Sequence, residues 1–194
     1  LNVEATAGGW GGFAENDGQS GLINNVNGDF KNLPIEVLED KYPLKVTTYG
    51  FRPNSGGPGK NRGGLGIVRG YEVLTDEAFL YLWFERSITP AWGLFGGGKA
   101  SKPEVTIYDG SKVEKVLKVN AKPLKKGSKV VVKTGGGGGF GHPFEREVSR
   151  VLEDVIDGYI DRQAALEQYG VVIKSEGLEV DEQATINYRQ ANRN

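Results

Sequence analysis

The stretch TGGGGGFGHPFERE, residues 134–147, holds the residues best suited to chemistry. Five consecutive glycines, Gly135–Gly139, precede His142, the only histidine of the chain, and Glu145 and Arg146 follow it. Glycine-rich loops can cradle phosphate through their backbone N–H groups, and histidine can act as a base or bind a metal. The first question is therefore whether this stretch forms a catalytic or anion-binding site.

Neither kind of site matches a complete pattern. The glycine run is not GxxxxGK[ST], and it leads to Pro143. A Rossmann turn needs a helix directly after the glycines, whereas the next predicted helix begins near Glu147. A hydrolytic triad could use only His142 as its base, no GxSxG elbow is present, and metal binding would need further ligands. The sequence therefore identifies no catalytic residue, predicts no metal site within this segment, and does not favour catalysis by this chain alone.

The glycine run itself calls for a different explanation. Ordering five such residues costs roughly 1–2 kcal/mol each in backbone entropy alone. A turn needs only one or two glycines, so Gly135–Gly139 predicts a place where Cβ atoms would clash with a neighbouring backbone. We expect an ordered, largely buried strap in which Arg146 forms an anchoring salt bridge. The alternative is a mobile linker.

A second candidate surface is the loop NSGGPGKNRGG, residues 54–64, with Asn54 and Ser55 at its start. We expect Arg52 and Arg62 to brace this loop at an active-site mouth or a subunit interface. A planar guanidinium can bind carboxylate or carbonyl groups through two parallel hydrogen bonds. The alternative is that these arginines only cap surface turns.

Composition excludes several functional classes. The 194 residues carry a formal net charge of −1, so no overall basic field attracts nucleic acid or anionic lipid. Cysteine is absent, which excludes disulfides and a thiol nucleophile and fits a reducing, cytoplasmic setting. No apolar run approaches the ~20 residues of a membrane span. Neither nucleic acid nor a membrane is therefore expected as a partner.

The elements that must position these residues are mostly strands. The apolar run AFLYLWFER, residues 78–86, is expected to be the most buried strand. The lysine-rich segment between Lys118 and Lys129 suits an exposed turn or edge. The other predicted strands span residues 44–52, 65–75, 105–108, 113–119, 128–134 and 171–173.

Helices are fewer and concentrate at the C-terminal end. One is predicted at residues 34–41 and one at residues 147–160. Asp161 should cap a further helix that ends at Gly170, and Asp181 should cap a last one. The predicted fold class is α+β, mostly β with glycine-rich loops, and with a C-terminal helical appendix. We divide the chain into a β-rich domain, residues 1–147, and a helical segment packed on it, residues 148–194.

The motifs together resemble the hydantoinase B/oxoprolinase family. GGGGGFGHPFERE followed by VSRVLEDVIDGYIDRQAALEQYGVVI is similar to the family's C-terminal signature. TAGGWGG, DGQSG, LPIEVLEDKYPL, YGFRPNSGGPGKNRGGLGIVRGYEVL and WGLFGGG occur in the family's order. The resemblance extends from about Glu4 to Asp181, and the ordered set is highly specific.

The resemblance implies one part of a larger enzyme. Members work beside a hydantoinase A-type ATP-binding subunit and open cyclic amides such as hydantoins or 5-oxoproline, and close relatives carboxylate acetone or acetophenone. ATP and a divalent metal are expected for the complex, both bound outside this segment. The expected partners are the N-terminal part of the same B-type subunit, the A-type subunit, and a small cyclic amide or ketone. The missing start methionine fits a fragment of a longer subunit.

One position departs from the family pattern. Many relatives have aspartate where this chain has His142, giving GDP-[LF]-ER, which argues against a required catalytic acid or metal ligand there. The sequence therefore predicts a segment of an ATP-dependent amidohydrolase or carboxylase subunit that is not catalytic alone. The alternative is a non-catalytic β-rich binding or assembly module whose glycine loops are only close-packing sites.

Overall fold

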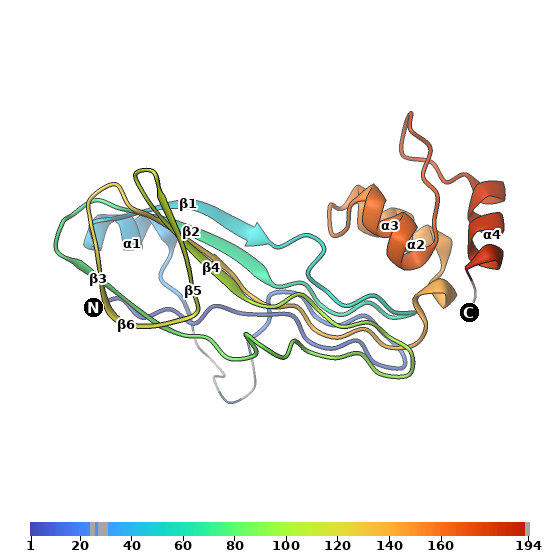
Figure 1. Ribbon diagram of the computed structural model, residues 1–194, viewed down its shortest axis with the longest axis horizontal. Coiled ribbons are helices and arrows are strands. Elements are labelled where there is room, and N and C mark those ends of the chain that lie inside the picture. Colours follow the sequence, from blue (N-terminus) through green and yellow to red (C-terminus); the bar gives the residue numbers. More distant parts are fainter. Residues whose placement is uncertain (24–25, 27–30, 193–194) are drawn as a thin grey trace.

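The computed structural model describes residues 1–23, 26 and 31–192. The molecule is elongated, with the strands at one end, the last three helices at the other, and extended glycine-rich segments between them (Figure 1). The helices are α1 (Ile35–Lys41), the 3-10 turn η2 (Pro143–Glu145), α2 (Val148–Ile156), α3 (Arg162–Tyr169) and α4 (Glu182–Ala191). The strands are β1 (Leu44–Phe51), β2 (Ile67–Val73), β3 (Ala78–Trp83), β4 (Glu104–Asp109), β5 (Lys112–Val116), β6 (Lys118–Leu124) and β7 (Lys129–Lys133).

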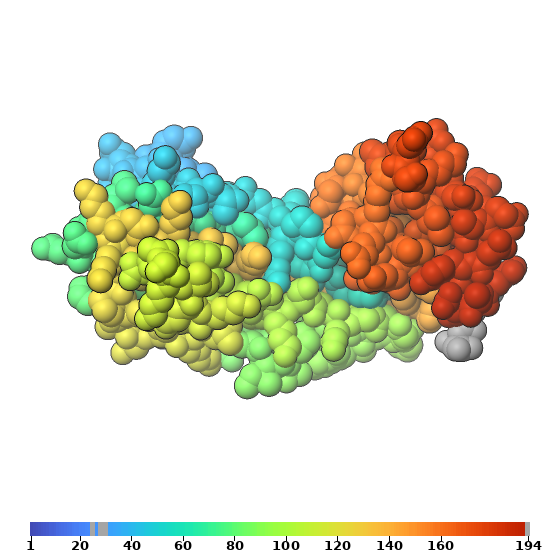
Figure 2. Space-filling model, turned by 45° about the horizontal axis from the view of Figure 1, so that its top comes forward, coloured from blue at the N-terminus to red at the C-terminus, as the bar shows by residue number. Residues whose placement is uncertain are grey.

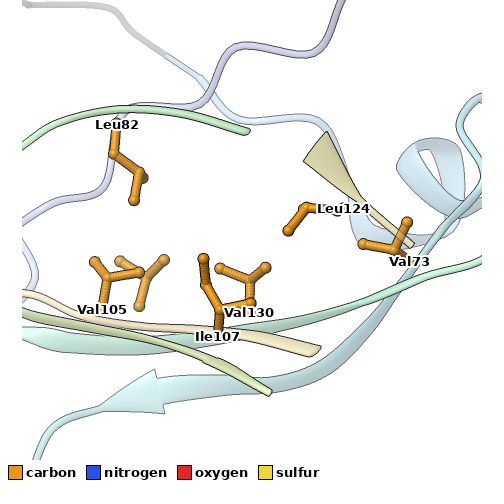
Figure 3. Close-up of a cluster of buried hydrophobic side chains, with 7 residues drawn as sticks. Val73, Leu82, Val105, Ile107, Leu124 and Val130 are labelled. Carbon is orange, nitrogen blue, oxygen red and sulfur yellow. The ribbon is translucent and has the colours of Figure 1, made fainter. Parts of the chain in front are cut away.

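The strands form two antiparallel sheets. The larger has the order β1-β2-β7-β4-β5, and the smaller pairs β3 with β6. The strand end of the molecule has one hydrophobic core, in which Leu82 of β3 and Leu124 of β6 face Val105, Ile107 and Val130 of the larger sheet (Figure 3). The two sheets therefore form a small sandwich, and the predicted α+β class with mostly β structure is confirmed.

Three strand predictions need correction. The run at residues 78–86 is not the most buried strand: β3 ends at Trp83 and buries only one face, because the described chain supplies a covering sheet on that side alone. The predicted strand 113–119 is two strands, which break at Leu117. Residues 171–173 form no strand, since Ile173 makes only a single bridge to Val180.

The lysine-rich segment after Lys118 contains an edge strand, β6, rather than only a turn. Its partner is β3, and Pro123 and two lysines, Lys118 and Lys122, lie along it. Proline and lysine at an edge discourage pairing with other chains. The expectation of an edge is therefore confirmed, and the expectation of a simple turn is replaced by a regular strand.

Helices α3 and α4 begin, and α3 ends, where the capping residues predict. The carboxylate of Asp161 accepts from the Ala164 N–H at 2.7 Å, and that of Asp181 accepts from the Ala184 N–H at 2.9 Å. Gly170 ends α3 in the left-handed region, at φ 64°. The second predicted helix is shorter than expected, because α2 ends at Ile156.

Helices α2 and α3 bury a second hydrophobic cluster, formed by Val151, Ile160, Ala164, Ala165, Tyr169 and Val171. The helices therefore have a core of their own. On the surface they form a distinct mass at one end of the molecule (Figure 2). Whether residues 1–147 and 148–194 are separate domains stays a prediction.

Glycine-rich segments fill the middle of the molecule and run side by side (Figure 1). We call them the glycine bundle: residues 8–12, 17–21, 55–66, 92–101 and 134–140. They are joined by backbone hydrogen bonds, such as Gly12 N–H to the Gly138 carbonyl at 2.8 Å and Gly57 N–H to the Gly137 carbonyl at 2.8 Å. Gly137 in turn donates to the Gly64 carbonyl at 2.9 Å. The central segment, 134–140, thus pairs with several neighbours at once.

Three neighbours leave no room for side chains on the central segment. A Cβ on Gly136 would lie 2.1 Å from the Ser55 carbonyl oxygen, and one on Gly137 would lie 1.8 Å from that of Trp10. One on Gly138 would lie 1.8 Å from that of Trp92.

The direction in which a Cβ atom would point repeats every three residues along the central segment. A Cβ on Gly139 would again meet the 55–58 segment, 2.0 Å from the Pro58 carbonyl oxygen, as Gly136 meets Ser55. A period of three is that of a polyproline II helix, which has no internal hydrogen bonds and leaves its N–H and C=O groups available to neighbours. The strap prediction is confirmed for Gly135–Gly139, and the mobile linker is wrong.

Gly137→Ala tests this packing. The added Cβ would overlap a backbone carbonyl that cannot move alone, so the free energy of unfolding should fall by about 1–3 kcal/mol or more. Gly50→Ala is the control, since a Cβ on Gly50 in β1 meets nothing within 4 Å. It should be neutral or stabilising by ~0.5 kcal/mol. Urea denaturation measures both, and equal effects would show that the close approach is not required.

Candidate functional site

The predicted site residues lead to a group of charged side chains where the glycine bundle meets the helices. We call it the arginine–aspartate cluster: Asp17, Arg62, Arg146, Arg150 and Asp154. Asp17 and Arg62 come from two segments of the glycine bundle, Arg146 follows η2, and the other two lie on α2. The cluster therefore joins three parts of the chain that are far apart in sequence.

Arg146 lies at the centre of the cluster. Its two terminal nitrogens donate to the two carboxylate oxygens of Asp17, at 2.7 and 2.8 Å, and one of them also donates to Asp154 at 2.8 Å. Arg62 binds the same Asp154 carboxylate with Nε and one terminal nitrogen, both at 3.1 Å. Arg150 adds a bond to Asp17 at 2.7 Å. The anchoring salt bridge predicted for Arg146 is thus confirmed.

Three members of the cluster are almost completely buried, so neighbouring charges strongly affect the pKa values of Arg146 and Asp17. Arg146 is 2% exposed, Arg62 4% and Asp154 5%. Burial alone would lower the pKa of Arg146, but Asp17 and Asp154 raise it above its ordinary value. Burial would raise the pKa of Asp17, but the hydrogen bonds and charge of Arg146, with Arg62 and Arg150, hold it below the ordinary 3.8. Both groups therefore stay charged at neutral pH.

The cluster is built for attachment rather than for proton transfer. Both carboxylates accept hydrogen bonds from two or more donors, so neither is poised to act as a base. The same contacts oppose a cation, because a metal would have to displace guanidinium groups. No group of three His, Cys, Asp or Glu side chains suited to a metal ion occurs among the described residues.

The loop residues Arg52, Asn54 and Ser55 also have partners inside the chain. Arg52 donates to the Lys102 and Thr134 carbonyls, at 2.6 and 3.1 Å, and to Glu104 at 2.5 Å. Asn54 exchanges two hydrogen bonds with Asp161, the N-cap of α3. The buried Ser55 hydroxyl donates to the Arg52 carbonyl at 2.6 Å. These residues brace the loop from within the chain, so the arginines do more than cap surface turns. That the loop lies at an active-site mouth or a subunit interface stays a prediction.

His142 and Glu145 are not part of the cluster. The His142 Nδ1 accepts from the Phe144 N–H at 3.1 Å and so caps η2, and its ring meets Phe144 edge-on with the centroids 5.3 Å apart. Glu145 is exposed. The structure thus brings Arg62 and Arg146 together, through Asp154, and packs Ser55 against Gly136. His142 and Glu145 lie outside both groups.

Sequence reasoning missed the acidic partners, Asp17 and Asp154. Asp154 is three residues after Val151 and therefore lies on the apolar face predicted for this helix. A charge on a buried face needs a buried partner, and that signal could have identified it. Asp17 has no comparable signal, because it lies among small polar residues in a glycine-rich stretch.

Comparison with known proteins places this architecture in a family. The family model described as hydantoinase B/oxoprolinase matches residues 1–143. The chain belongs to the hydantoinase B/oxoprolinase family. Among the described residues, no helix has the length and apolar character needed to cross a membrane.

Several relatives in this family carry informative names. A Pseudomonas sp. (strain NS671) protein, provisionally named as the B subunit of a D-/L-hydantoinase, is 34% identical over 97% of this chain and 32% of its own length. The beta subunit of the Pseudomonas jessenii caprolactamase is 32% identical over 81% of this chain and 28% of its own. The chain thus spans about a third of the length of these curated relatives.

Solved structures share the fold. The ATP-dependent caprolactamase from Pseudomonas jessenii matches 95% of this chain and 33% of its own, with a TM-score of 0.74 and 27% identity. A nucleotide-free acetone carboxylase matches 97% of this chain and 30% of its own, with a TM-score of 0.78 and 24% identity. The arrangement of sheets, bundle and helices is therefore common to these proteins.

The capping role of His142 is one that an aspartate carboxylate could also fill. His142→Asp keeps an acceptor at the N-cap, so stability should stay within ~0.5 kcal/mol, whereas His142→Ala should lose about 0.5–2 kcal/mol. Thermal unfolding of both variants measures the difference. If His142→Asp were stable but abolished an activity of the assembled enzyme, the position would have a chemical role beyond capping.

The variant Asp17→Asn tests whether the stability contributed by the arginine–aspartate cluster depends on pH. At pH 7 it should lower the free energy of unfolding by about 2–3 kcal/mol, because it leaves buried guanidinium groups short of a carboxylate. Since the folded-state pKa of Asp17 lies below 3.8, its contribution is complete above that pH and is lost as the pH falls through the folded value. The difference between wild type and variant in urea should therefore shrink toward pH 3.

Glu176→Gln, which neutralises an exposed carboxylate away from the cluster, is the control and should leave the wild-type pH profile unchanged. A constant difference between wild type and Asp17→Asn from pH 7 to pH 3 would contradict the ion-pair account.

Proposed function

We propose that this chain is the C-terminal part of a hydantoinase B-type subunit in an ATP-dependent enzyme that acts on a cyclic amide or a related ketone. It works with an A-type ATP-binding subunit and with the remaining part of its own subunit. The observation that carries the proposal is the family match over residues 1–143, joined to a shared fold over 95% of the chain with a caprolactamase at 27% identity.

Within that enzyme, this segment is a rigid scaffold rather than the catalytic centre. The charged groups of the cluster are paired with one another, and the candidate loop residues are occupied by internal hydrogen bonds. ATP and a divalent metal would bind elsewhere, because Asp17 and Asp154 are already held by arginines. The segment's contribution is to hold its loops and surfaces in fixed positions for the rest of the assembly.

Ring opening is the reaction we favour. The relatives with at least 30% identity include proteins named for hydantoin, caprolactam and 5-oxoproline, all cyclic amides. The acetone carboxylase alpha subunit of Xanthobacter autotrophicus is less similar, at 27% identity. Carboxylation of a ketone is therefore the second candidate for the same assembly.

The test is turnover by the full-length B-type subunit with its A-type partner. We expect ATP-dependent ring opening of hydantoin, 5-oxoproline or caprolactam, measured by product formation and ADP release, and no turnover without ATP. ATP-dependent fixation of bicarbonate with acetone would instead identify the carboxylase. If no cyclic amide or ketone stimulates ATP hydrolysis, the proposal fails, and the non-catalytic binding or assembly module becomes the better explanation.

A further inference from the structure

The outer face of β3 carries three large aromatic side chains and no cover. Phe79, Tyr81 and Trp83 alternate along the strand and are 62%, 43% and 75% exposed. Leu80 and Leu82, between them, face the core. We call Phe79, Tyr81 and Trp83 the aromatic row. A strand that is apolar on both faces is typical of a sheet covered on both sides, yet the described chain covers only one.

The backbone holds this row in place. β3 pairs with β6 in a register that sets Phe79 beside Pro123 and Trp83 beside Lys118. The rings of Tyr81 and Trp83 lie 6.3 Å apart, centre to centre. Because Leu82 anchors the other side of the strand in the core, the row cannot turn inward to bury itself. The row is therefore a preformed apolar surface. Only another folded segment or another chain packed against it could shield it from water.

The charge beside Trp83 is already paired. Lys118, which lies opposite Trp83 in the register, forms an ion pair with Glu85 at 2.7 Å. This pair has no net charge with which to steer a separate, transient partner. An apolar centre with few free charges suits a permanent interface, of the kind found within one polypeptide or an obligate assembly.

The length of the relatives indicates which part of the protein could cover the aromatic row. This chain corresponds to 28–32% of the two named subunits and to 33% of the solved caprolactamase chain, so roughly two thirds of each continuous polypeptide lies outside it. A covalently connected segment is present at high effective concentration and meets an apolar face before any separate molecule does. We propose that the aromatic row is the docking surface for the remaining part of the same B-type subunit.

This inference rests on the proposed function for the existence of that longer subunit, and its test uses the full-length protein. Tyr81→Cys places a thiol in a segment that has no cysteine of its own, and the unsubstituted protein is the blank. Maleimide labelling should be at least ~10-fold slower in the native subunit than in urea, because a covered thiol is unreactive. Phe79→Cys, on the same face, should behave alike and guards against one variant misfolding.

Tyr108→Cys is the matched control. Tyr108 is also an exposed aromatic on a strand, but it lies on β4 and outside the row. It should be labelled at similar rates in the native and denatured subunit. Labelling of the Tyr81→Cys and Phe79→Cys thiols as fast in the native subunit as in urea would overturn the proposal.

A photocrosslinker attached to the Tyr81→Cys thiol identifies the occupant. The expected product migrates as a single subunit and maps to a peptide of the same polypeptide outside this chain. A crosslink to a second copy or to the A-type subunit would overturn the proposal. If the subunit turns over substrate but the thiols in the row react freely in the native protein, only the docking proposal is refuted. If the crosslink is intramolecular but no ATP-dependent turnover occurs, only the proposed function is refuted.

Discussion

Backbone segments in the glycine bundle lie so close together that no side-chain carbon fits between them. The carbonyl oxygens of Ser55, Trp10 and Trp92 occupy the places where Cβ atoms of Gly136, Gly137 and Gly138 would be. Hydrogen bonds between segments join many of their N–H and C=O groups, so backbone polar groups do much to hold the middle of the molecule together. The two ends, each with an ordinary core, are held apart by this central part.

The glycines of the bundle have no side chains with which to hold the helices that follow it. The attachment is made by two long side chains, Arg62 within the bundle and Arg146 beyond its last segment, which reach the carboxylate of Asp154 on α2. A buried ion pair contributes little net stability when desolvation is counted, but its geometry is demanding. The cluster therefore fixes where the helices lie on the bundle more than it adds to the free energy of folding.

Local signals predicted local structure well. The caps at Asp161, Asp181 and Gly170 depend on partners within a few residues. The glycine run predicted close packing because a turn needs only one or two glycines and ordering five is costly. The carboxylate partner of Arg146 could be expected but not named, since Asp17 lies 129 residues away and only the path of the whole chain brings it near. For β3, the apolar run correctly indicated a strand but could not say which of its faces this chain would cover.

The position of the cluster explains how the last helix is tied to the bundle. Arg189 of α4 donates to the Tyr169 carbonyl at 3.0 Å and to the Arg146 carbonyl at 3.1 Å. Arg146 thus holds Asp17 and Asp154 with its side chain while its backbone receives α4. The family model ends at residue 143, three residues before this arginine, and the helices beyond it connect back through Asp17 and Arg62 in the matched region. A displacement of α4 would therefore be felt first at Arg146, whereas a displacement of α2 would also reach the glycine bundle directly, at Arg62 and Asp17.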